Sequence, residues 1–273
     1  MHRNPVIVLI FTHKEHLEWF EQISLRQCIK VLGRHPIRLV CPEGLDLTEY
    51  RAIEPNLSAD FIPSHWLQSL RAYNRLKILP WLYRRYADYE FMLTYELDAF
   101  VFRDELLDWC AKSWDYVGAP WFDGYYLASP DAKPAGVGNS GFSLRRTQAM
   151  LRVGRTWRYQ QPAYSVLWGW WKGRSSLKNT LAALTIRNNF YASFNDYPGN
   201  EDGFWGQTVA RRFSWFRVAP YEVARAFSFE ANPSRLYREC DNILPFGCHK
   251  WMELEPQFWK EHIPSADSKT RSG

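Results

Sequence analysis

The chain has 273 residues, 46% hydrophobic and 23% charged, which is enough apolar material for a buried core and excludes a disordered protein. The net charge of +5 comes from 34 basic and 29 acidic residues that form no run, which argues against a nucleic-acid-binding protein. The five cysteines are an odd number without a CxxC pair, so we expect free thiols in a reducing compartment. No segment approaches the roughly 20 apolar residues of a membrane helix. These features predict a cytoplasmic protein.

The first half of the chain alternates apolar runs with helical patterns. Strands are predicted at 6–11, 37–42 and 59–63, with helices over 15–33 and near Thr48 between them. Another helical pattern starts at Ser64, a candidate N-cap, and continues to residue 86 with an interruption at Pro80. The apolar run 89–102 is typical of a central strand. This alternation predicts an α/β protein with one domain over residues 1–263 and a flexible polar tail over 264–273.

Two acidic residues, Glu96 and Asp98, lie toward the end of the most strand-like run. Side chains two residues apart in a strand share a face, so both carboxylates can address one cation. Their oxygen atoms suit Mg²⁺ or Mn²⁺, although acids at strand ends are also common as solvated loop residues. Ligands of open α/β sheets bind beyond the carboxyl ends of the strands, which favours a metal site here.

The segment 71–102 resembles the nucleotide-sugar-binding stretch of GT-A-fold glycosyltransferases, most nearly the retaining galactosyltransferase type. The sequence YNRLKI at 73–78 stands where that type has YxRLKL, and Glu96-Leu97-Asp98 stands where it has DxD, with glutamate as a departure. The phrases ISLRQC, LVCPEGLD, ELDAFVF, GAPWFDGY and GFSLRR also resemble a bacterial GT-A-like family of generally unassigned activity from polysaccharide and lipopolysaccharide gene neighbourhoods. The resemblance implies a GT-A-like single domain with a Rossmann-like, mostly parallel central sheet flanked by helices.

The same resemblance implies contacts to a nucleotide-sugar donor. Arg75 would contact the nucleotide, while Asp98, helped by Glu96, would bind the cation on the diphosphate. Arg71 and Lys77 add positive charge, although such side chains also commonly cover a solvated helix face. A cation and basic groups stabilise the charge that develops on a leaving diphosphate. The other candidate donor contacts are Thr12, at the end of the first strand, and Asn139 and Ser140, in a glycine-rich segment that equally fits a simple turn.

A second acidic cluster, Asn200-Glu201-Asp202, precedes a helical pattern that continues through Arg212. Acids at a helix start also occur as caps. The cluster resembles the acidic motif that follows DxD in GT-A enzymes. By that resemblance Asp202 is the candidate general base of an inverting reaction and Glu201 a contact to a sugar hydroxyl, whereas in the retaining type the acidic segment lines the sugar pocket.

His249 resembles the C-terminal histidine that completes the metal site of GT-A enzymes. The nearby Gly247 and Lys250-Trp251 resemble the HxxGxxKPW pattern, with a different order and spacing. A lone histidine is also common as a structural residue. Cys248 has no second cysteine or histidine at zinc spacing, so we reject zinc. The candidate metal ligands are therefore Asp98, His249 and Glu96.

Aromatic residues concentrate in the segments 118–126 and 157–171. Rigid rings stack on the C–H faces of pyranoses, so the first segment is a candidate sugar or acceptor platform. The second has cationic flanks and is typical of a segment that lies against lipid headgroups, with an aromatic core or an oligomer contact as the alternative. The candidate substrate contacts are Trp121, Phe122, Asp123 and Trp205.

These patterns predict a glycosyltransferase that moves a sugar, expected to be a hexose, from a nucleoside diphosphate sugar to a saccharide or lipid-linked saccharide in surface polysaccharide synthesis. The resemblance favours UDP as the nucleotide and Mn²⁺ or Mg²⁺ as the cation. The aromatic segment 157–171 would allow peripheral contact with the inner membrane surface. The alternative is a non-catalytic carbohydrate-binding or complex-forming protein on the same scaffold, in which Glu96 marks the loss of tight metal binding. Inverting and retaining chemistry both remain open.

Overall fold

The computed structural model describes residues 4–156, 163–185, 194 and 197–264. A six-stranded sheet forms its centre, with the strand order β3-β2-β1-β4-β9-β6. The first four strands pair in parallel, and β9 and β6 add antiparallel pairs at one edge. The expected α/β fold with a mostly parallel central sheet is confirmed. The strands of this sheet are β1 (Asn4–Phe11), β2 (Ile37–Pro42), β3 (Ala59–Ile62), β4 (Tyr89–Tyr95), β6 (Tyr116–Val117) and β9 (Phe142–Arg146).

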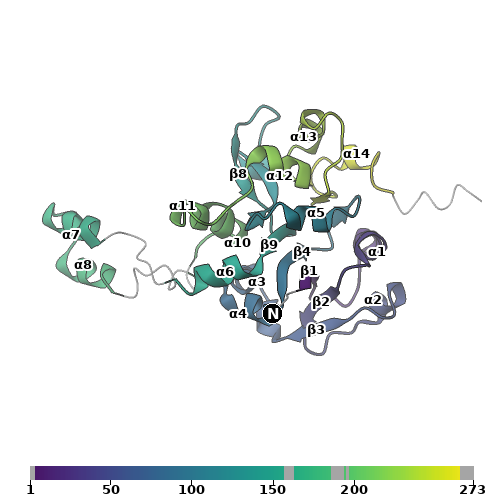
Figure 1. The fold of residues 1–273 in the computed structure, drawn as a ribbon, viewed down its shortest axis with the longest axis horizontal. Coiled ribbons are helices and arrows are strands. Elements are labelled where there is room, and N and C mark those ends of the chain that lie inside the picture. The colour runs from purple at the N-terminus through teal and green to yellow at the C-terminus, as the bar shows by residue number, and fades with distance from the viewer. Residues whose placement is uncertain (1–3, 157–162, 186–193, 195–196, 265–273) are drawn as a thin grey trace, which may run out of the picture.

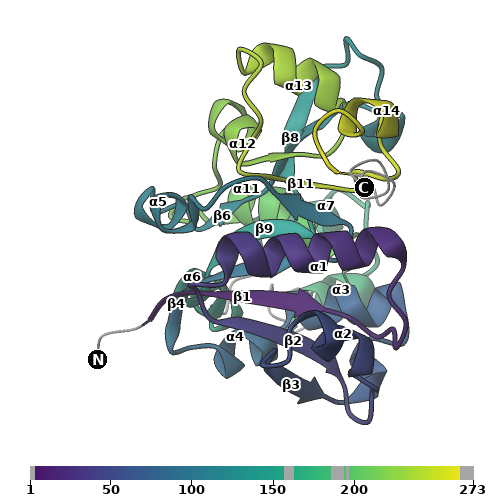
Figure 2. The same cartoon turned by 90° about the vertical axis from the view of Figure 1, so that its right-hand side faces the viewer.

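Helices cover both faces of the central sheet. Alternate side chains of β1 enter two separate cores, because successive residues of a strand point to opposite faces. Val8 packs in one core with Leu25 of α1, and Leu9 packs in the other with Leu76 of α3. Burial on both sides explains why β1 is an apolar run without alternation. Figure 2 shows α1 lying along β1. The helices around the sheet are α1 (Trp19–Leu32), α2 (Thr48–Ile53), α3 (Leu70–Ile78), α4 (Pro80–Arg85), α5 (Leu106–Ala111) and α6 (Thr147–Gly154).

Two smaller sheets pack beside this sheet. A three-stranded sheet has the order β10-β11-β5, and a two-stranded sheet pairs β7 with β8. They surround a third apolar core that contains Phe100, Phe229 and Trp259. The strands of this region are β5 (Ala99–Val101), β7 (Ala119–Phe122), β8 (Pro134–Gly138), β10 (Ser228–Phe229) and β11 (Gly247–His249). The helices after residue 200 are α10 (Glu201–Gly203), the π-helical turn η4 (Phe204–Val209), α11 (Ala210–Arg212), α12 (Tyr221–Phe227), α13 (Pro233–Glu239) and α14 (Pro256–Trp259). Of these, η4 packs into the core of the central sheet that contains Leu9 and Leu76. The short 3-10 turn η1 (Ser64–Trp66) precedes α3, and η2 (Tyr125–Leu127) follows β7.

Two predicted elements differ from the structure. The run 89–102 is two strands rather than one, because β4 ends at Tyr95 and β5 belongs to another sheet. The helix expected from Ser64 begins later, since the Ser69 hydroxyl accepts a hydrogen bond from the Ala72 amide and caps α3. Pro80 starts the separate helix α4, where its missing N–H costs no helical hydrogen bond.

Helices α7 (Ala163–Trp171) and α8 (Leu177–Ala183) lie beside each other and away from the sheets (Figure 1). Residues 157–162, which include Trp157 and Tyr159 of the aromatic segment, and 265–273 of the expected tail lie outside the described residues. Within the described part of the chain, no helix is both long enough and apolar enough to cross a bilayer.

Candidate metal centre and its cavity

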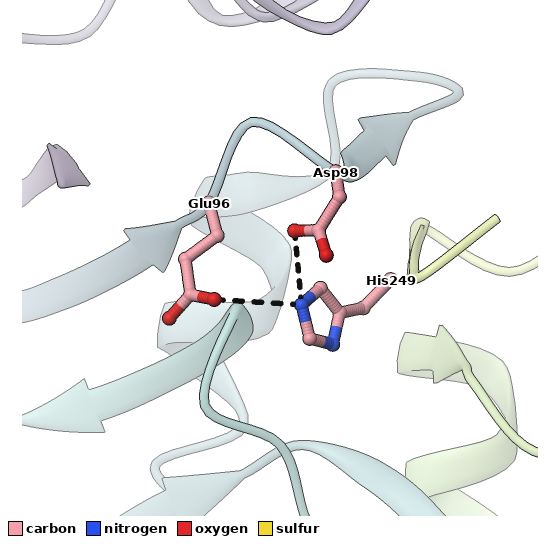
Figure 3. Close-up of side chains that lie close together, drawn as sticks. All are labelled: Glu96, Asp98 and His249. Atoms are coloured by element: carbon pink, nitrogen blue, oxygen red, sulfur yellow. Dashed lines mark ion pairs between the residues drawn. The ribbon is translucent and has the colours of Figure 1, made fainter. Parts of the chain in front are cut away.

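Glu96, Asp98 and His249 converge from two elements that are far apart in sequence. Glu96 follows β4, where its backbone amide bonds to the carbonyl of Gly141, and Asp98 precedes β5. Antiparallel pairing of β5 with β11 places His249 opposite Ala99 and so beside Asp98. The His249 Nε2 atom lies 3.1 Å from Asp98 Oδ1 and 3.6 Å from Glu96 Oε2 (Figure 3). Each of the three side chains offers one metal-ligand atom, and these atoms all lie within 4.8 Å of one another, so they form one candidate metal centre.

The ring of His249 is oriented by Glu230, which follows β10. The Nδ1 atom lies 2.7 Å from Glu230 Oε1, and because a carboxylate only accepts, Nδ1–H is the donor. In the neutral ring this tautomer leaves a lone pair on Nε2. Nε2 is buried and makes no hydrogen bond among the described residues. Nε2 faces the carboxylates of Asp98 and Glu96, which pair with it when the ring is charged and would share a cation with it when the ring is neutral.

Burial alone would lower the pKa of His249, because desolvation disfavours the charged ring. Asp98 and the other carboxylates around it outweigh that effect and raise the pKa of His249 well above its usual value. The site is therefore strongly negative and draws a positive charge to Nε2. The ring also needs Gly141 beside it, because a Cβ at that position would overlap the imidazole.

Glu96 is held by three donors on a single oxygen. Its Oε1 accepts hydrogen bonds from Tyr73 (2.7 Å), Lys77 (2.7 Å) and Ser140 (3.1 Å). Burial would raise the pKa of Glu96, but the attraction of Lys77 and the contact with His249 hold it well below its usual value. Glu96 is therefore ionised, and the oxygen that faces His249 is Oε2 rather than the one that the three donors occupy.

A cavity of about 560 Å³ opens beside this centre. Residues 11–14 after β1 and residues 96–98 after β4 line it. Strands β2 and β3 lie on one side of β1 and β4 on the other, so the cavity is at the point where the strand order reverses. Open α/β sheets bind ligands at this switch point, and the volume is in the range of small-molecule sites.

Lys14 and Lys250 are the lysines that line this cavity. Each is paired with an acid at the cavity, Lys14 with Glu21 and Lys250 with Glu253. Neither lysine is among the contacts predicted from the sequence. Lys250 directly follows the candidate ligand His249, and that adjacency was the available signal. Lys14 has only its place just after the first strand.

The predicted basic contacts Arg71, Arg75 and Lys77 do not line the main cavity. Arg71 and Arg75 lie on another face of α3 and line a second cavity of about 440 Å³. Lys77 is fully buried, with its Nζ bonded to Glu96 and to the Ser140 carbonyl and hydroxyl. The prediction that Lys77 contacts the nucleotide is wrong, because the side chain has no exposed surface. It instead fixes the ionised form of Glu96.

The two acids of the second cluster have different surroundings. Glu201 is fully buried and forms an ion pair of 2.7 Å with Arg145, so the predicted contact to a sugar hydroxyl is wrong. Asp202 is nearly buried, and its Oδ1 accepts a hydrogen bond from the Gly203 amide. Burial, followed by the charges of Glu201 and Glu230, raises the pKa of Asp202 to about 7. A carboxyl group with such a pKa exchanges protons near neutral pH.

The donor contacts predicted from the first strand and the glycine-rich segment occupy three environments. Thr12 lines the cavity, and its hydroxyl lies 2.7 Å from Tyr50 Oη. Ser140 joins the Glu96 network described above. Asn139 is fully buried, and its side-chain Oδ1 accepts hydrogen bonds from the amides of Gly141 and Phe142. This oxygen therefore stabilises the turn before β9 and does not face a nucleotide-sugar donor.

The predicted substrate contacts are mostly core residues. Trp205 is fully buried, donates its Nε1–H to the Lys77 carbonyl and stacks on Phe216. Phe122 is fully buried in the third core. Neither can contact a substrate, because their rings complete the interior. Trp121 is nearly buried and packs on Tyr125, whereas Asp123 is exposed.

The fold of the chain is similar to those of several glycosyltransferases of known structure. The chain aligns over 97% of its length with 93% of the galactosyltransferase LgtC, solved in complex with donor and acceptor sugar analogues, at 13% identity and a TM-score of 0.50. It is also similar to mouse xyloside xylosyltransferase 1 in its apo form, with 12% identity, 90% and 97% coverage and a TM-score of 0.49. A glycosyltransferase involved in glycosylation of the major capsid of PBCV-1 gives 13% identity, 95% and 98% coverage and a TM-score of 0.43. The protein has the fold of the GT-A glycosyltransferases.

A family model described as "Protein of unknown function (DUF5672)" matches residues 56–249, and the chain belongs to this family. The matched segment contains Glu96 and Asp98 and ends at His249. No curated protein matches the sequence.

Proposed function

We propose that this protein is a metal-dependent glycosyltransferase that uses a nucleoside diphosphate sugar as donor and a saccharide or lipid-linked saccharide as acceptor. The observation that carries the proposal is the convergence of Glu96, Asp98 and the Nε2 atom of His249 beside a cavity at the reversal point of the sheet. The GT-A fold supports the same reaction class. UDP is the proposed nucleotide and a hexose the proposed sugar, both from the resemblance of segment 71–102 to the galactosyltransferase type.

The residues present fit a divalent cation. Two carboxylates and one imidazole suit Mn²⁺ better than Mg²⁺, because Mg²⁺ favours an all-oxygen set. A cation bound here would neutralise charge on the donor diphosphate and on the departing nucleotide. Glu96, held ionised by Lys77, keeps Oε2 directed toward His249 and the candidate metal centre. Such fixed charges need little reorganisation during the reaction.

The lysines at the cavity are the proposed diphosphate contacts. Lys14 and Lys250 both line the space in which a nucleotide would lie. Their present partners, Glu21 and Glu253, leave each ammonium with donors to spare, since an ammonium group has three N–H bonds. A lysine that moves between its acid and a phosphate oxygen balances charge in both states of the site. We therefore propose that Lys14 and Lys250 supply the positive charge toward the nucleotide diphosphate that was predicted for Arg75 and Lys77.

Asp202 is the proposed carboxylate of the sugar and acceptor region. Its pKa of about 7 makes it able to accept a proton at neutral pH. Burial, followed by the charges of Glu230 and Asp202, raises the pKa of the Tyr126 phenol, so Asp202 and the acid that orients His249 act on the same side chain. In an inverting reaction Asp202 takes the proton of the acceptor hydroxyl, and in a retaining one it lines the donor sugar. The anomeric configuration of the product, read by NMR, distinguishes the two.

A thermal-shift panel with UDP, GDP, CMP and dTDP, each with and without Mn²⁺, tests the donor site. A ligand that binds only the native state at a hundred times its Kd stabilises it by about 2.7 kcal/mol, or roughly 5–10 °C for a chain of this size. We expect a cation-dependent shift for one nucleotide that Asp98→Asn abolishes. Asp108→Asn removes an exposed acid on α5 and is the matched control.

No shift with any nucleotide in folded protein contradicts the donor site. A shift without hydrolysis or transfer of the matching sugar nucleotide instead identifies the non-catalytic binding protein, the alternative that the glutamate at position 96 raises. The two results separate donor binding from catalysis. The measurement therefore decides between an enzyme and a binding protein on the same scaffold.

A further inference from the structure

The hairpin formed by α7 and α8 exposes an unusual number of large apolar side chains. It spans residues 163–183, yet it supplies seven of the fifteen large exposed apolar residues found in the described part of the chain. Tyr164 is 75% exposed and Trp171 is 67% exposed. Exposed apolar groups gathered in this way mark an interaction surface. The seven residues, here called the hairpin surface, are Tyr164, Leu167, Trp168, Trp170, Trp171, Leu177 and Leu181.

The hairpin surface follows the helical repeat. Tyr164, Leu167, Trp168 and Trp171 are spaced three and four residues apart and therefore lie along one side of α7. The Trp168 and Trp171 rings are neighbours, with centroids 4.9 Å apart. On α8 the pair Leu177 and Leu181 has the same spacing. The alternative prediction, that the segment 157–171 forms an aromatic core, is wrong for its described residues. Only Val166 and Thr180 of the hairpin are buried, and neither is aromatic.

The charged residues near the hairpin surface indicate what kind of partner binds it. No Asp or Glu occurs from residue 132 to residue 195, although the chain as a whole contains 29 acids. Lys172, Arg174 and Lys178 are exposed on the hairpin itself. The Lys172 ammonium lies 4.7 Å from the ring centre of Trp171 and 5.0 Å from that of Trp168. Cations therefore border the aromatic rings without a neighbouring acid on the hairpin, which complements an anionic partner.

We propose that the α7–α8 hairpin binds the protein to the surface of an anionic lipid bilayer. Trp and Tyr place amphipathic rings at the headgroup level, and Lys and Arg beside them are attracted to anionic lipids. The helices are too short to span a bilayer, so the hairpin lies in the interface. It stands away from the sheets (Figure 1), and none of its residues lines the main cavity, so the hairpin can contact a membrane without contributing to the cavity.

The hairpin surface is also connected to the proposed reaction. In sequence it lies between α6 and α10, and α10 carries Asp202. A bilayer bound at the hairpin would bring lipid-linked saccharides to the protein, the membrane-bound class among the proposed acceptors. The docking itself does not rest on the proposed function, since lipid binding and sugar transfer are measured separately.

Vesicle flotation with the full chain tests the proposal. One set of vesicles contains only phosphatidylcholine and the other contains about 30% phosphatidylglycerol, a fraction large enough to give a strongly negative surface. We expect binding to the anionic vesicles to exceed binding to the neutral ones by roughly tenfold or more, and to weaken at high salt. Replacing two rings, as Trp168→Ser with Trp171→Ser, lowers anionic binding by roughly tenfold or more. Replacing Lys172, Arg174 and Lys178 by Ser removes the anionic preference.

The control carries two comparably exposed apolar residues from outside the hairpin, Leu127→Ser with Ile243→Ser, and keeps full binding. An unchanged unfolding midpoint shows that each variant is folded. Wild-type protein that binds neither vesicle, or hairpin variants that bind as wild type does, overturn the proposal. A wild-type dimer in solution that the Trp variant converts to monomer, with no vesicle binding by either, overturns it in favour of a second copy as the occupant.

Discussion

At the scale of single residues, two of the three candidate metal ligands, Glu96 and His249, already have their second polar atom occupied. Glu96 uses Oε1 for three donors and turns Oε2 to His249, and His249 uses Nδ1 for Glu230 and turns Nε2 to the acids. The ligand atoms of Glu96 and His249 are thus oriented by a partner on the other side of each side chain. Metal-binding side chains depend on such partners for orientation and basicity. The preorganisation comes from Lys77 and Glu230, which are both buried.

Glu230→Gln tests the positioning of His249. The amide is nearly isosteric, but it carries no charge and can donate as well as accept, so it no longer fixes Nδ1–H and the free Nε2 lone pair. We expect Mn²⁺ affinity, measured by calorimetry, to fall roughly 10- to 100-fold. Glu253→Gln is the control, because Glu253 lies at the same cavity but pairs with Lys250. Unchanged Mn²⁺ affinity in folded Glu230→Gln protein would show that Glu230 only packs.

Asp202 should make the stability of the protein depend on pH. Its folded pKa of about 7 lies above the unfolded value, so between about pH 4 and pH 7 the folded state keeps a proton that the unfolded state releases. Stability attributable to this group is therefore full at low pH and is lost as the pH rises to 7. Asp202→Asn cannot ionise and avoids that loss. A shift of this size corresponds to roughly 4 kcal/mol.

The measurement is urea unfolding of wild type and Asp202→Asn at pH 4.5 and at pH 8. We expect similar stability at the lower pH and a variant more stable by a few kcal/mol at the higher pH. Asp108→Asn, which changes an exposed acid, controls for net charge. If Asp202 also serves the reaction, the stabilised variant loses activity, a trade-off common at functional sites. An equal difference in stability at both pH values contradicts the raised pKa.

At the scale of elements, local patterns predicted the sheet better than the site. The apolar runs identified β1, β2 and β3 with nearly correct ends, because most residues of β1 and the middle of β2 are buried and turn or helix signals bound all three runs. The break after Tyr95 was missed, since Leu97 and Ala99 continue the apolar pattern while the chain passes between sheets. Pairing of β5 with β11 joins residues almost 150 positions apart, and no local pattern records it.

Helix α3 depends on a cap that the sequence placed one turn too early. Ser69→Ala removes the hydroxyl that accepts from the Ala72 amide and should cost about 1 kcal/mol of unfolding free energy. Because α3 carries Tyr73 and Lys77, a frayed start also loosens Glu96 and weakens Mn²⁺ binding. The control is Ser64→Ala, the cap predicted from sequence, with a cost within about 0.5 kcal/mol. Equal losses from both variants, measured by urea unfolding, would contradict this assignment.

At the scale of the whole molecule, the candidate metal ligands could be predicted from the sequence, whereas the residues that orient them or line the cavity could not. Glu96, Asp98 and His249 belong to short motifs, so the resemblance found them before the structure brought them together. Glu230, Lys14 and Lys250 act through contacts set by tertiary packing, which a single sequence does not record. Trp205 and Phe122 show the converse error, because aromatic rings near a motif are as useful to a core as to a sugar.

Residues on both sides of the hairpin build one core, which supports a single domain over residues 1–263. Met150 and Val153 before the hairpin share an apolar cluster with Trp205 and Val209 after it. The buried ion pair between Arg145 and Glu201 crosses the same junction. We therefore propose that the chain either side of the hairpin folds as one unit that needs no covalent connection through α7 and α8.

Limited trypsin digestion tests this unit. Lys172 and Arg174 are exposed in the connection between α7 and α8, so cleavage there should be early and should give two fragments on a denaturing gel. Under native conditions the fragments stay together, because the shared core and the buried ion pair hold them, and the unfolding midpoint moves by only a few degrees, or roughly 1 kcal/mol. Lys172→Ser with Arg174→Ser removes the products that end at these residues. Fragments that separate on native size exclusion would show two independent units. If the hairpin binds a bilayer, anionic vesicles should also slow the cleavage at Lys172 and Arg174.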